Sequence, residues 1–348
     1  MNKIAPVCKL GHVELTTPDI DTSLHFFRDL VGLDVVAEHD GRIYMRAWNE
    51  IDHHSLVLRE GPTGVGHFAL RAASSKHLDL IAEDLRAHDI AVEEVGGGVE
   101  LGQGDAIRFT SPQGHPWEVY WETEKGRQDS RLLNQRGRAY LRGSSPMHLD
   151  HINIACVDVT EGEQFLADRL GFMRREYVQP TGGPVVASWM SVTSQCHDIA
   201  IAMDPPPSLS NGRLHHISYI HQDRSDVLRA GEIMRDAGVT IDLAPGKHGI
   251  SQAFFLYVKD PGSGHRVELF AGGYHIFDTD WEPIKWDENN ITTGMVWVGP
   301  DFLPGSGGPM DPTTPCIPKP PITSSRVKPA STILGTDNDL QSALTEVS

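Results

Sequence analysis

The chain has 348 residues, of which 39% are apolar and 22% are charged, as is ordinary for a globular protein of one or two domains. Its net charge of −17 argues against a nucleic-acid partner, because phosphates would be repelled. No apolar run approaches the ~20 residues that span a bilayer, and no signal-peptide pattern is present. The four cysteines are scattered and form no CxxC pair. These features predict a cytoplasmic protein without a disulfide framework.

A short strand pattern that begins with a histidine recurs four times along the chain. The four copies are residues 11–17, 66–72, 150–156 and 215–221. Each copy is followed by an amphipathic helix pattern and then by two or three short strand candidates. The repeating unit therefore reads βαβββ, and four copies predict stacked modules rather than a doubly wound sheet.

The helix patterns have recognisable ends. Ser75 is the expected N-cap of the second helix, whereas the other three are expected to stop at Gly32, Gly171 and Gly238. The spacing of apolar residues predicts the face that each helix buries. For the fourth helix this face consists of Val227, Ala230, Ile233 and Ala237.

We predict an α+β protein in which the four βαβββ modules pair into two domains. A polar, Arg-rich connector at 122–148 suggests a boundary near residue 140, so that the domains are 1–140 and 141–300. Residues 301–348 are rich in Pro, Gly and Ser at their start and lack periodicity, which predicts a tail that cannot form a core of its own.

The second domain contains three candidate metal ligands on separate strands: His151, His216 and Glu268. Because a strand alternates faces, each of them would lie opposite the apolar face of its own strand. Two imidazoles and one carboxylate leave three positions open on an octahedral iron, although a zinc hydrolase could use the same ligands. A single histidine on a strand is more often structural, but three ligand types in matching positions of a repeat favour a metal site.

Four stretches carry a resemblance to a known family. The segments "LDHINI", "CHDIAI", "LHHISYI" and "PGKHGISQAFFLYVKDPGSGHRVELFAGGY" together resemble type I extradiol catechol dioxygenases of the vicinal oxygen chelate superfamily. The similarity covers residues 8 to 295 and is greatest to the catechol 2,3-dioxygenase and homoprotocatechuate 2,3-dioxygenase branches. It implies extradiol (meta) cleavage of a catechol by dioxygen, with a product of the 2-hydroxymuconic semialdehyde type, in aromatic degradation.

The resemblance also implies roles for individual residues. In the family, the second domain binds Fe(II), or occasionally Mn(II), through two histidines and a glutamate that match His151, His216 and Glu268. The family's acid/base histidine matches His197, which would stabilise charge during oxygen attack and then deliver a proton.

Four more positions match residues of the family's pocket. His248 and Tyr257 match a histidine and a tyrosine that act in catalysis and contact the substrate, where they would favour the catechol monoanion. Asn153 and Trp189 match positions that line the same cavity. Members of the family commonly form tetramers, which implies a homo-oligomer here.

The first domain repeats the same pattern in part. His12, His67 and Glu118 occupy the positions equivalent to His151, His216 and Glu268, and His54 occupies the position equivalent to His197. However, the position of Tyr257 is taken by Arg108, and a cationic side chain opposes metal binding. The resemblance agrees, because the family's first domain is normally empty, so we expect a metal-free relic of duplication there. A second metal site is the alternative.

The expected substrate is a neutral, monocyclic catechol, such as catechol or a methyl- or chloro-substituted one, and a bicyclic diol is the alternative. Homoprotocatechuate enzymes carry arginines that bind the substrate carboxylate, but the aligned positions here are Leu243 and the uncharged run 289–297. A buried carboxylate without a partner would be costly. Two other classes remain as alternatives: another vicinal-oxygen-chelate metalloenzyme, such as an isomerase or a transferase, and a non-catalytic module that binds aromatic compounds.

Overall fold

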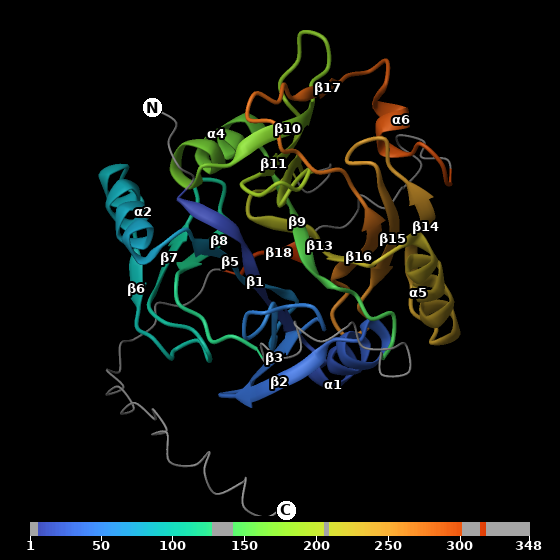
Figure 1. The fold of residues 1–348 in the computed structure, drawn as a ribbon, viewed down its shortest axis with the longest axis horizontal. Coiled ribbons are helices and arrows are strands. Elements are labelled where there is room, and N and C mark those ends of the chain that lie inside the picture. The colour runs from blue at the N-terminus through green and yellow to red at the C-terminus, as the bar shows by residue number, and fades with distance from the viewer. Residues whose placement is uncertain (1–5, 127–141, 205–208, 301–313, 318–348) are drawn as a thin grey trace, which may run out of the picture. The chain divides into compact units, whose positions relative to one another are not determined.

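The computed structural model describes residues 6–126, 142–204, 209–300 and 314–317. These residues belong to one compact body that contains two β-sheets, one from each half of the chain (Figure 1). The predicted domain boundary near residue 140 falls outside the described residues, and so does the predicted tail except for 314–317.

The first half of the chain forms an eight-stranded sheet with the order β2-β3-β4-β1-β5-β8-β7-β6. Its strands are β1 (Val7–Thr17), β2 (Asp34–His39), β3 (Arg42–Arg46), β4 (Leu56–Glu60), β5 (Gly64–Ala72), β6 (Glu93–Val95), β7 (Ala106–Thr110) and β8 (Pro116–Tyr120). The helices of this half are α1 (Ile20–His25), which continues as a π-helical turn η1 (Phe26–Val31), and α2 (Ser75–Ala87).

The second half forms a ten-stranded sheet with the order β14-β15-β16-β13-β9-β12-β11-β10-β17, and β18 joins β13 beside this path. Its strands are β9 (His148–Cys156), β10 (Met173–Val178), β11 (Ala187–Ser191), β12 (Ile199–Met203), β13 (Arg213–Ile220), β14 (Ile241–Lys247), β15 (Ala253–Lys259), β16 (Arg266–Gly272), β17 (Ile284–Trp286) and β18 (Thr314–Pro315). Its helices are α4 (Val159–Leu170), α5 (Arg224–Asp236) and α6 (Ile291–Met295).

The pairing of the strands reveals four modules. In each module a strand leads to a helix and then to three strands, and the last strand returns parallel to the first: β4 to β1, β8 to β5, β12 to β9 and β16 to β13. Two modules join in each sheet through the antiparallel pairs β1–β5 and β9–β13. The prediction of four βαβββ modules is therefore confirmed.

The helix ends follow their capping residues, with two corrections. The N-cap of α2 is Ser74 rather than Ser75, and its side chain accepts a hydrogen bond from the His77 N–H. In α5 the third buried residue is Met234, whereas Ala237 lies beyond the last helical residue and is exposed. The predicted stop after α4 is correct, because Gly171 has a left-handed φ of 81° there.

Two histidines connect the halves in matching fashion. Nε2 of His115, in the turn between β7 and β8, donates to the carbonyl oxygen of Ala155 in β9 over 3.0 Å. Nε2 of His265, in the turn before β16, donates to the carbonyl oxygen of Thr16 in β1 over 3.0 Å. The described piece of the tail also contacts both halves, since β18 pairs with β13 and the next residues hydrogen-bond to Val65.

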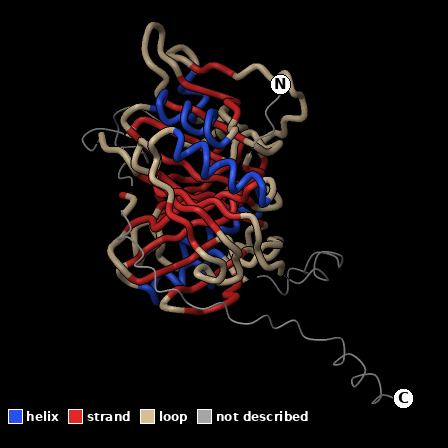
Figure 2. Tube along the Cα trace, turned by 90° about the vertical axis from the view of Figure 1, so that its left-hand side faces the viewer, coloured by secondary structure: helices blue, strands red, loops and turns tan. Residues whose placement is uncertain are grey.

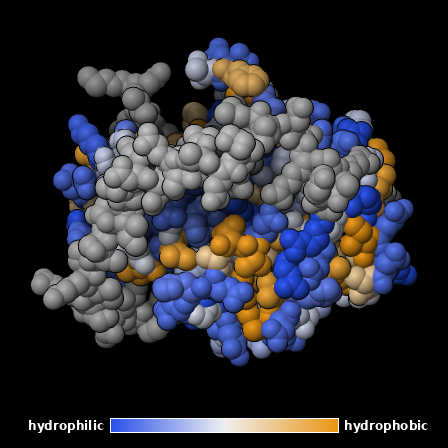
Figure 3. Space-filling model, turned by 60° about the horizontal axis from the view of Figure 1, so that its bottom comes forward, coloured by the Kyte–Doolittle hydropathy of each residue, from blue (hydrophilic) through white to orange (hydrophobic). Residues whose placement is uncertain are grey.

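The apolar core lies between the sheets and the helices that cover them. α2 and α4 contact one another as well as their own sheets, and α5 covers β14, β15 and β16 (Figure 1). Figure 2 shows the strands, in red, in the middle of the body with helices, in blue, packed against them. On the face drawn in Figure 3, polar and apolar residues are interspersed among the described part of the surface. No helix among the described residues is long and apolar enough to cross a membrane.

Candidate metal centre

The candidate ligands lie side by side because of the strand register in the second sheet. Ser218 of β13 is opposite His151 of β9 on one side and Glu268 of β16 on the other, and Glu268 is opposite Tyr257 of β15. Residues directly opposite one another across paired strands place their side chains on the same face. His216 lies two residues from Ser218 and therefore shares that face. The register thus brings the three predicted ligands together.

The three donor atoms have the spacing of a metal site. Nε2 of His151 lies 2.9 Å from Oε2 of Glu268, and Nε2 of His216 lies 3.4 Å from both of those atoms. Donors bound at about 2.1 Å and at right angles to one another lie about 3 Å apart. All three side chains are buried. The donor set fits three adjacent corners of an octahedron around one ion.

Bulges in the central strands add a second layer of contacts that the sequence analysis missed. Asp150 is the extra residue of a bulge in β9, and its Oδ2 accepts a 2.9 Å hydrogen bond from Nδ1 of His151. A matching bulge in β13 places Nδ1 of His215 2.6 Å from Nδ1 of His216. Such partners fix the orientation of a ligating imidazole. In the sequence, the only sign of these contacts is that Asp150 directly precedes His151 and His215 directly precedes His216.

Hydrogen bonds from neighbouring side chains also hold Glu268 and Asp150 in place. Ser218 donates from Oγ to Oε2 of Glu268 over 2.8 Å, and Gln195 donates from Nε2 to Oδ1 of Asp150 over 2.5 Å. Burial opposes ionisation of Glu268, but the hydrogen bonds from His151 and His216 hold the pKa of Glu268 well below its ordinary value. Glu268 is therefore an ionised carboxylate, as a ligand for a cation must be.

The two imidazoles differ in charge. Burial lowers the pKa of His216 to about 4, so this ring is neutral and has a lone pair available. Burial also opposes charge on His151, but its hydrogen bonds with Asp150 and Glu268 raise its pKa to about 9. The proton between His151 and Glu268 occupies the space in which a bound cation would lie, and a divalent ion would displace it.

The remaining predicted residues surround this centre. The ring of His197 lies 4.1 Å from the ring of His151, and burial lowers the pKa of His197 well below its ordinary value. Nε2 of His248 lies 3.1 Å from the hydroxyl of Tyr257, and Nδ1 of His248 donates to the carbonyl oxygen of Met295 in α6. Burial and the nearby Glu268 raise the pKa of Tyr257 well above its ordinary value, so that its hydroxyl remains a donor.

A cavity of about 470 Å³ opens over the donors. All eight predicted site residues line it: His151, Asn153, Trp189, His197, His216, His248, Tyr257 and Glu268. Asn153 lines the cavity, and its buried Oδ1 has no hydrogen-bond partner among the described residues. Most of the other lining side chains are apolar, and Leu243 is among them, as the sequence analysis expected.

The first sheet has the same register with different side chains. His12, Ala69, Glu118 and Arg108 form the row that corresponds to His151, Ser218, Glu268 and Tyr257. Arg108 donates from Nε to Oε2 of Glu118 over 2.5 Å, and Oε1 of Glu118 is 3.7 Å from His12. The two bulge positions are also different, because Gly11 stands where β9 has Asp150, and Gly66 stands where β13 has His215.

Comparisons with known proteins agree with this geometry. The profile of the Glyoxalase/Bleomycin resistance protein/Dioxygenase superfamily matches residues 9–119 and 148–269. The chain is 45% identical to a manganese-dependent 2,3-dihydroxybiphenyl 1,2-dioxygenase of Geobacillus genomosp. 3, over 90% of this chain and 99% of the relative. It is 34% identical to a metapyrocatechase of Geobacillus stearothermophilus, over 86% of this chain and 92% of the relative.

The solved structures give the same result. The crystal structure of homoprotocatechuate 2,3-dioxygenase from Arthrobacter globiformis has a TM-score of 0.78 and 29% identity, and the match covers 90% of this chain and 94% of that chain. The chain therefore belongs to the Glyoxalase/Bleomycin resistance protein/Dioxygenase superfamily. Within it, this protein is an extradiol ring-cleaving dioxygenase of the catechol 2,3-dioxygenase type, so the predicted enzyme class is confirmed. The predicted cofactor, Fe(II) or Mn(II), suits the donor set.

Proposed function

We propose that this protein cleaves the aromatic ring of a catechol that carries a bulky, uncharged substituent. The bond that breaks lies beside the two hydroxyl-bearing carbons, not between them. A divalent ion bound by His151, His216 and Glu268 is the cofactor. The observation that carries the proposal is that these donors occupy only one face of an octahedron, and the opposite side faces the 470 Å³ cavity. An ion held by these three residues would have open positions and would supply Lewis-acid and redox chemistry toward a catechol and dioxygen. This explains why three ligands suffice.

We assign the proton transfers to His197. Burial keeps this imidazole neutral before substrate enters, so it can accept a proton from a catechol hydroxyl. The imidazolium that results can stabilise negative charge on the attacking oxygen. It can then return the proton when the O–O bond breaks. The tilted contact between the rings of His197 and His151, with centroids 4.1 Å apart, supports this position beside the reacting atoms.

We assign the orientation of the catechol to His248, Tyr257, Asn153 and Trp189. Tyr257 and His248 are hydrogen-bonded to each other, and the contact of His248 with α6 fixes its ring. Their polar atoms can hydrogen-bond a catechol oxygen and favour the monoanion. The buried, unpartnered Oδ1 of Asn153 supports an acceptor role toward a substrate hydroxyl. The indole of Trp189 forms part of the cavity wall.

The size and polarity of the cavity support a larger substrate than the predicted monocyclic catechol. An apolar cavity of about 150 Å³ is enough to hold benzene, whereas this one has about 470 Å³. Ala187, Ala200 and Ala202 on the paired strands β11 and β12 line one wall and leave room for a second ring. Among the described residues that line it, Asp204 and Glu268 are acidic and none is Lys or Arg, which disfavours a substrate carboxylate.

The decisive experiment loads metal-free protein with Fe(II) or Mn(II) without air, adds a catechol and then admits dioxygen. The panel contains catechol, 3-methylcatechol, 2,3-dihydroxybiphenyl and a carboxylated catechol. We expect a yellow ring-fission product, with the highest kcat/KM for the biphenyl diol and the lowest for the carboxylated compound. Tight binding without product would favour the non-catalytic binding module, and a colourless rearranged product would favour an isomerase or a transferase.

We also propose the division into domains at residues 1–140 and 141–300, because each half builds one sheet. Limited proteolysis between the two sheets tests this boundary, and two resistant fragments are the expected result. The homo-oligomer, a tetramer by analogy with the family, stays a prediction. Light scattering during gel filtration would measure it directly.

A further inference from the structure

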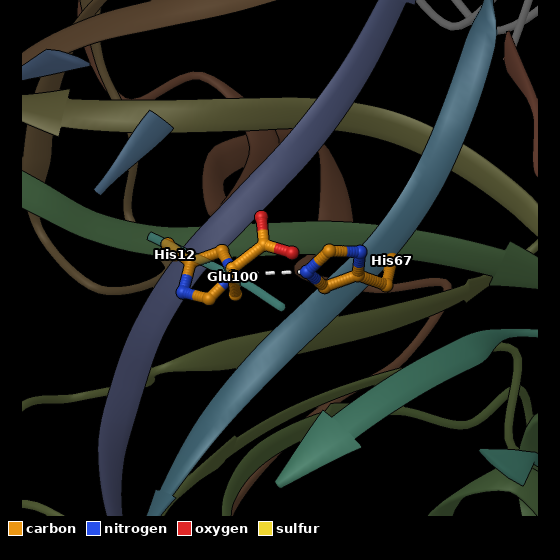
Figure 4. Close-up of side chains that lie close together, drawn as sticks. All are labelled: His12, His67 and Glu100. Carbon is orange, nitrogen blue, oxygen red and sulfur yellow. Dashed lines mark hydrogen bonds between the residues drawn. The ribbon is translucent and has the colours of Figure 1, made fainter. Parts of the chain in front are cut away.

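Three buried side chains of the first sheet form a second group of metal-type donors (Figure 4). His12 of β1 and His67 of β5 place their Nε2 atoms 2.9 Å apart, and both side chains are almost fully buried. Glu100 lies in the turn after β6 and is only 2% exposed. The ligand atoms of the three residues lie within 4.8 Å of one another, so small side-chain shifts would bring them around one ion.

One oxygen of Glu100 is an unexplained buried acceptor. Oε2 accepts a 2.9 Å hydrogen bond from Nη2 of Arg108, whereas Oε1 has no hydrogen-bond partner among the described residues. Figure 4 shows the carboxylate of Glu100 between the imidazole rings of His12 and His67. A buried carboxylate oxygen without a partner is costly. A cation bound between this oxygen and the two imidazoles would remove that cost.

The other carboxylate of the cluster is already engaged. Glu118 accepts hydrogen bonds from Gln103 and Arg108, and its Oε1 is 3.7 Å from His12 and 3.8 Å from His67. Arg108 therefore shares one positive charge between Glu100 and Glu118. Both buried carboxylates depend on the same guanidinium, and a divalent cation would add positive charge beside them. Arg108 also orients Glu100, as a second-layer partner of a ligand does.

We propose that His12, His67 and Glu100 bind a second divalent cation of the Zn(II) type, with a structural role. This site goes beyond the proposed function. It follows the alternative of a second metal site rather than the expected metal-free first half, with Glu100 instead of Glu118 as the third ligand. Two neutral imidazoles and a carboxylate are typical zinc donors. None of the three residues lines the cavity of about 470 Å³ over the candidate catalytic centre, so a structural ion is the role that suits a closed position.

The first test counts metal ions in the full-length protein after it has been equilibrated with Zn(II) and dialysed. We expect about two ions per chain in the wild type and about one in His216→Ala, which disables only the candidate catalytic centre. Circular dichroism and thermal unfolding confirm that the variant is folded. A folded His216→Ala protein that retains no ion overturns the proposal.

The second test removes the proposed carboxylate ligand and keeps its shape. Glu100→Gln should lose about one ion per chain but retain dioxygenase turnover when it is loaded with Fe(II). Glu94→Gln, which removes the same charge from an exposed side chain of β6, should retain both ions. In the wild type, a mild chelator should remove the first-half ion before turnover declines. If Glu100→Gln binds as many ions as the wild type, the assignment is wrong.

Discussion

Asp150 and His151 are neighbours in the chain, and their side chains are joined by a 2.9 Å hydrogen bond. Consecutive residues of a regular strand point to opposite faces, so this contact requires the bulge that β9 forms at Asp150. The hydrogen bond fixes the tautomer of His151 and leaves Nε2 directed at Glu268. The bulge in β9 thus orients His151 for binding a metal ion.

Replacing Asp150 by Ala should weaken metal binding about 10- to 100-fold while the fold is retained. The reason is that His151 loses the acceptor that orients its ring. Competition with a coloured chelator measures the affinity without any assay of turnover. Asp168→Ala, an exposed position on α4, is the matched control. An Asp150→Ala protein with the affinity of the wild type would show that the bulge contact is only structural.

Replacing His197 by Ala should lower kcat about 10²- to 10⁴-fold, because the proton acceptor and donor is lost. Metal content should stay at the level of the wild type, since the ring of His197 contacts the ring of His151 but is not one of the three donors. Turnover and bound metal are measured on the same preparation. Loss of the metal together with turnover would identify His197 as a ligand and contradict its assigned role.

Replacing Ala202 by Phe should narrow the cavity on its alanine-lined wall. We expect kcat/KM for a biphenyl diol to fall about tenfold or more, whereas unsubstituted catechol should be affected much less. The ratio of the two kcat/KM values is the readout, because it cancels differences in metal loading. Equal losses for both substrates would place the second ring elsewhere.

Stability should fall on acidification because of His115. Burial lowers the pKa of His115 to about 4 in the folded protein, against 6.5 for an exposed histidine. The unfolded chain therefore binds a proton that the folded chain excludes, so stability rises with pH through this interval. The free energy of unfolding is therefore greatest, as far as His115 is concerned, above pH 6.5. It falls by about 3 kcal/mol as the pH decreases from 6.5 to about 4.

Urea unfolding at several pH values between 4 and 7 tests this dependence. In His115→Gln the slope of unfolding free energy against pH should decrease by up to one proton, since Gln can still donate to Ala155 but does not titrate. His25→Gln, at an exposed position, is the control and should retain the slope of the wild type. An unchanged slope in His115→Gln would mean that other buried groups set the pH dependence.

Much of the fold could be predicted because its signals are local. The recurring histidine-led strands, the helix periodicity and the terminal glycines are all patterns of about ten residues, and they yielded the βαβββ repeat. The errors were also local. Ser74 and Ser75 are both good caps, and only the backbone geometry selects Ser74. In α5, Met234 is buried rather than the predicted Ile233, because a shift of one residue along a helix rotates the side chain by about 100°.

The sequence by itself determined the donor types and the enzyme class, since His151, His216 and Glu268 recur at equivalent positions of a repeat and carry a family signature. Only the tertiary structure decided which atoms meet. The register across β9, β13, β16 and β15 sets the distances between the donor atoms. The bulges at Asp150 and His215 allow each of these residues to contact the ligand that follows it in the chain. Tertiary contacts also bring Glu100, from the turn after β6, into one group with His12 and His67. Register and bulges depend on contacts between residues far apart in the chain, and these contacts have no signature in any single segment.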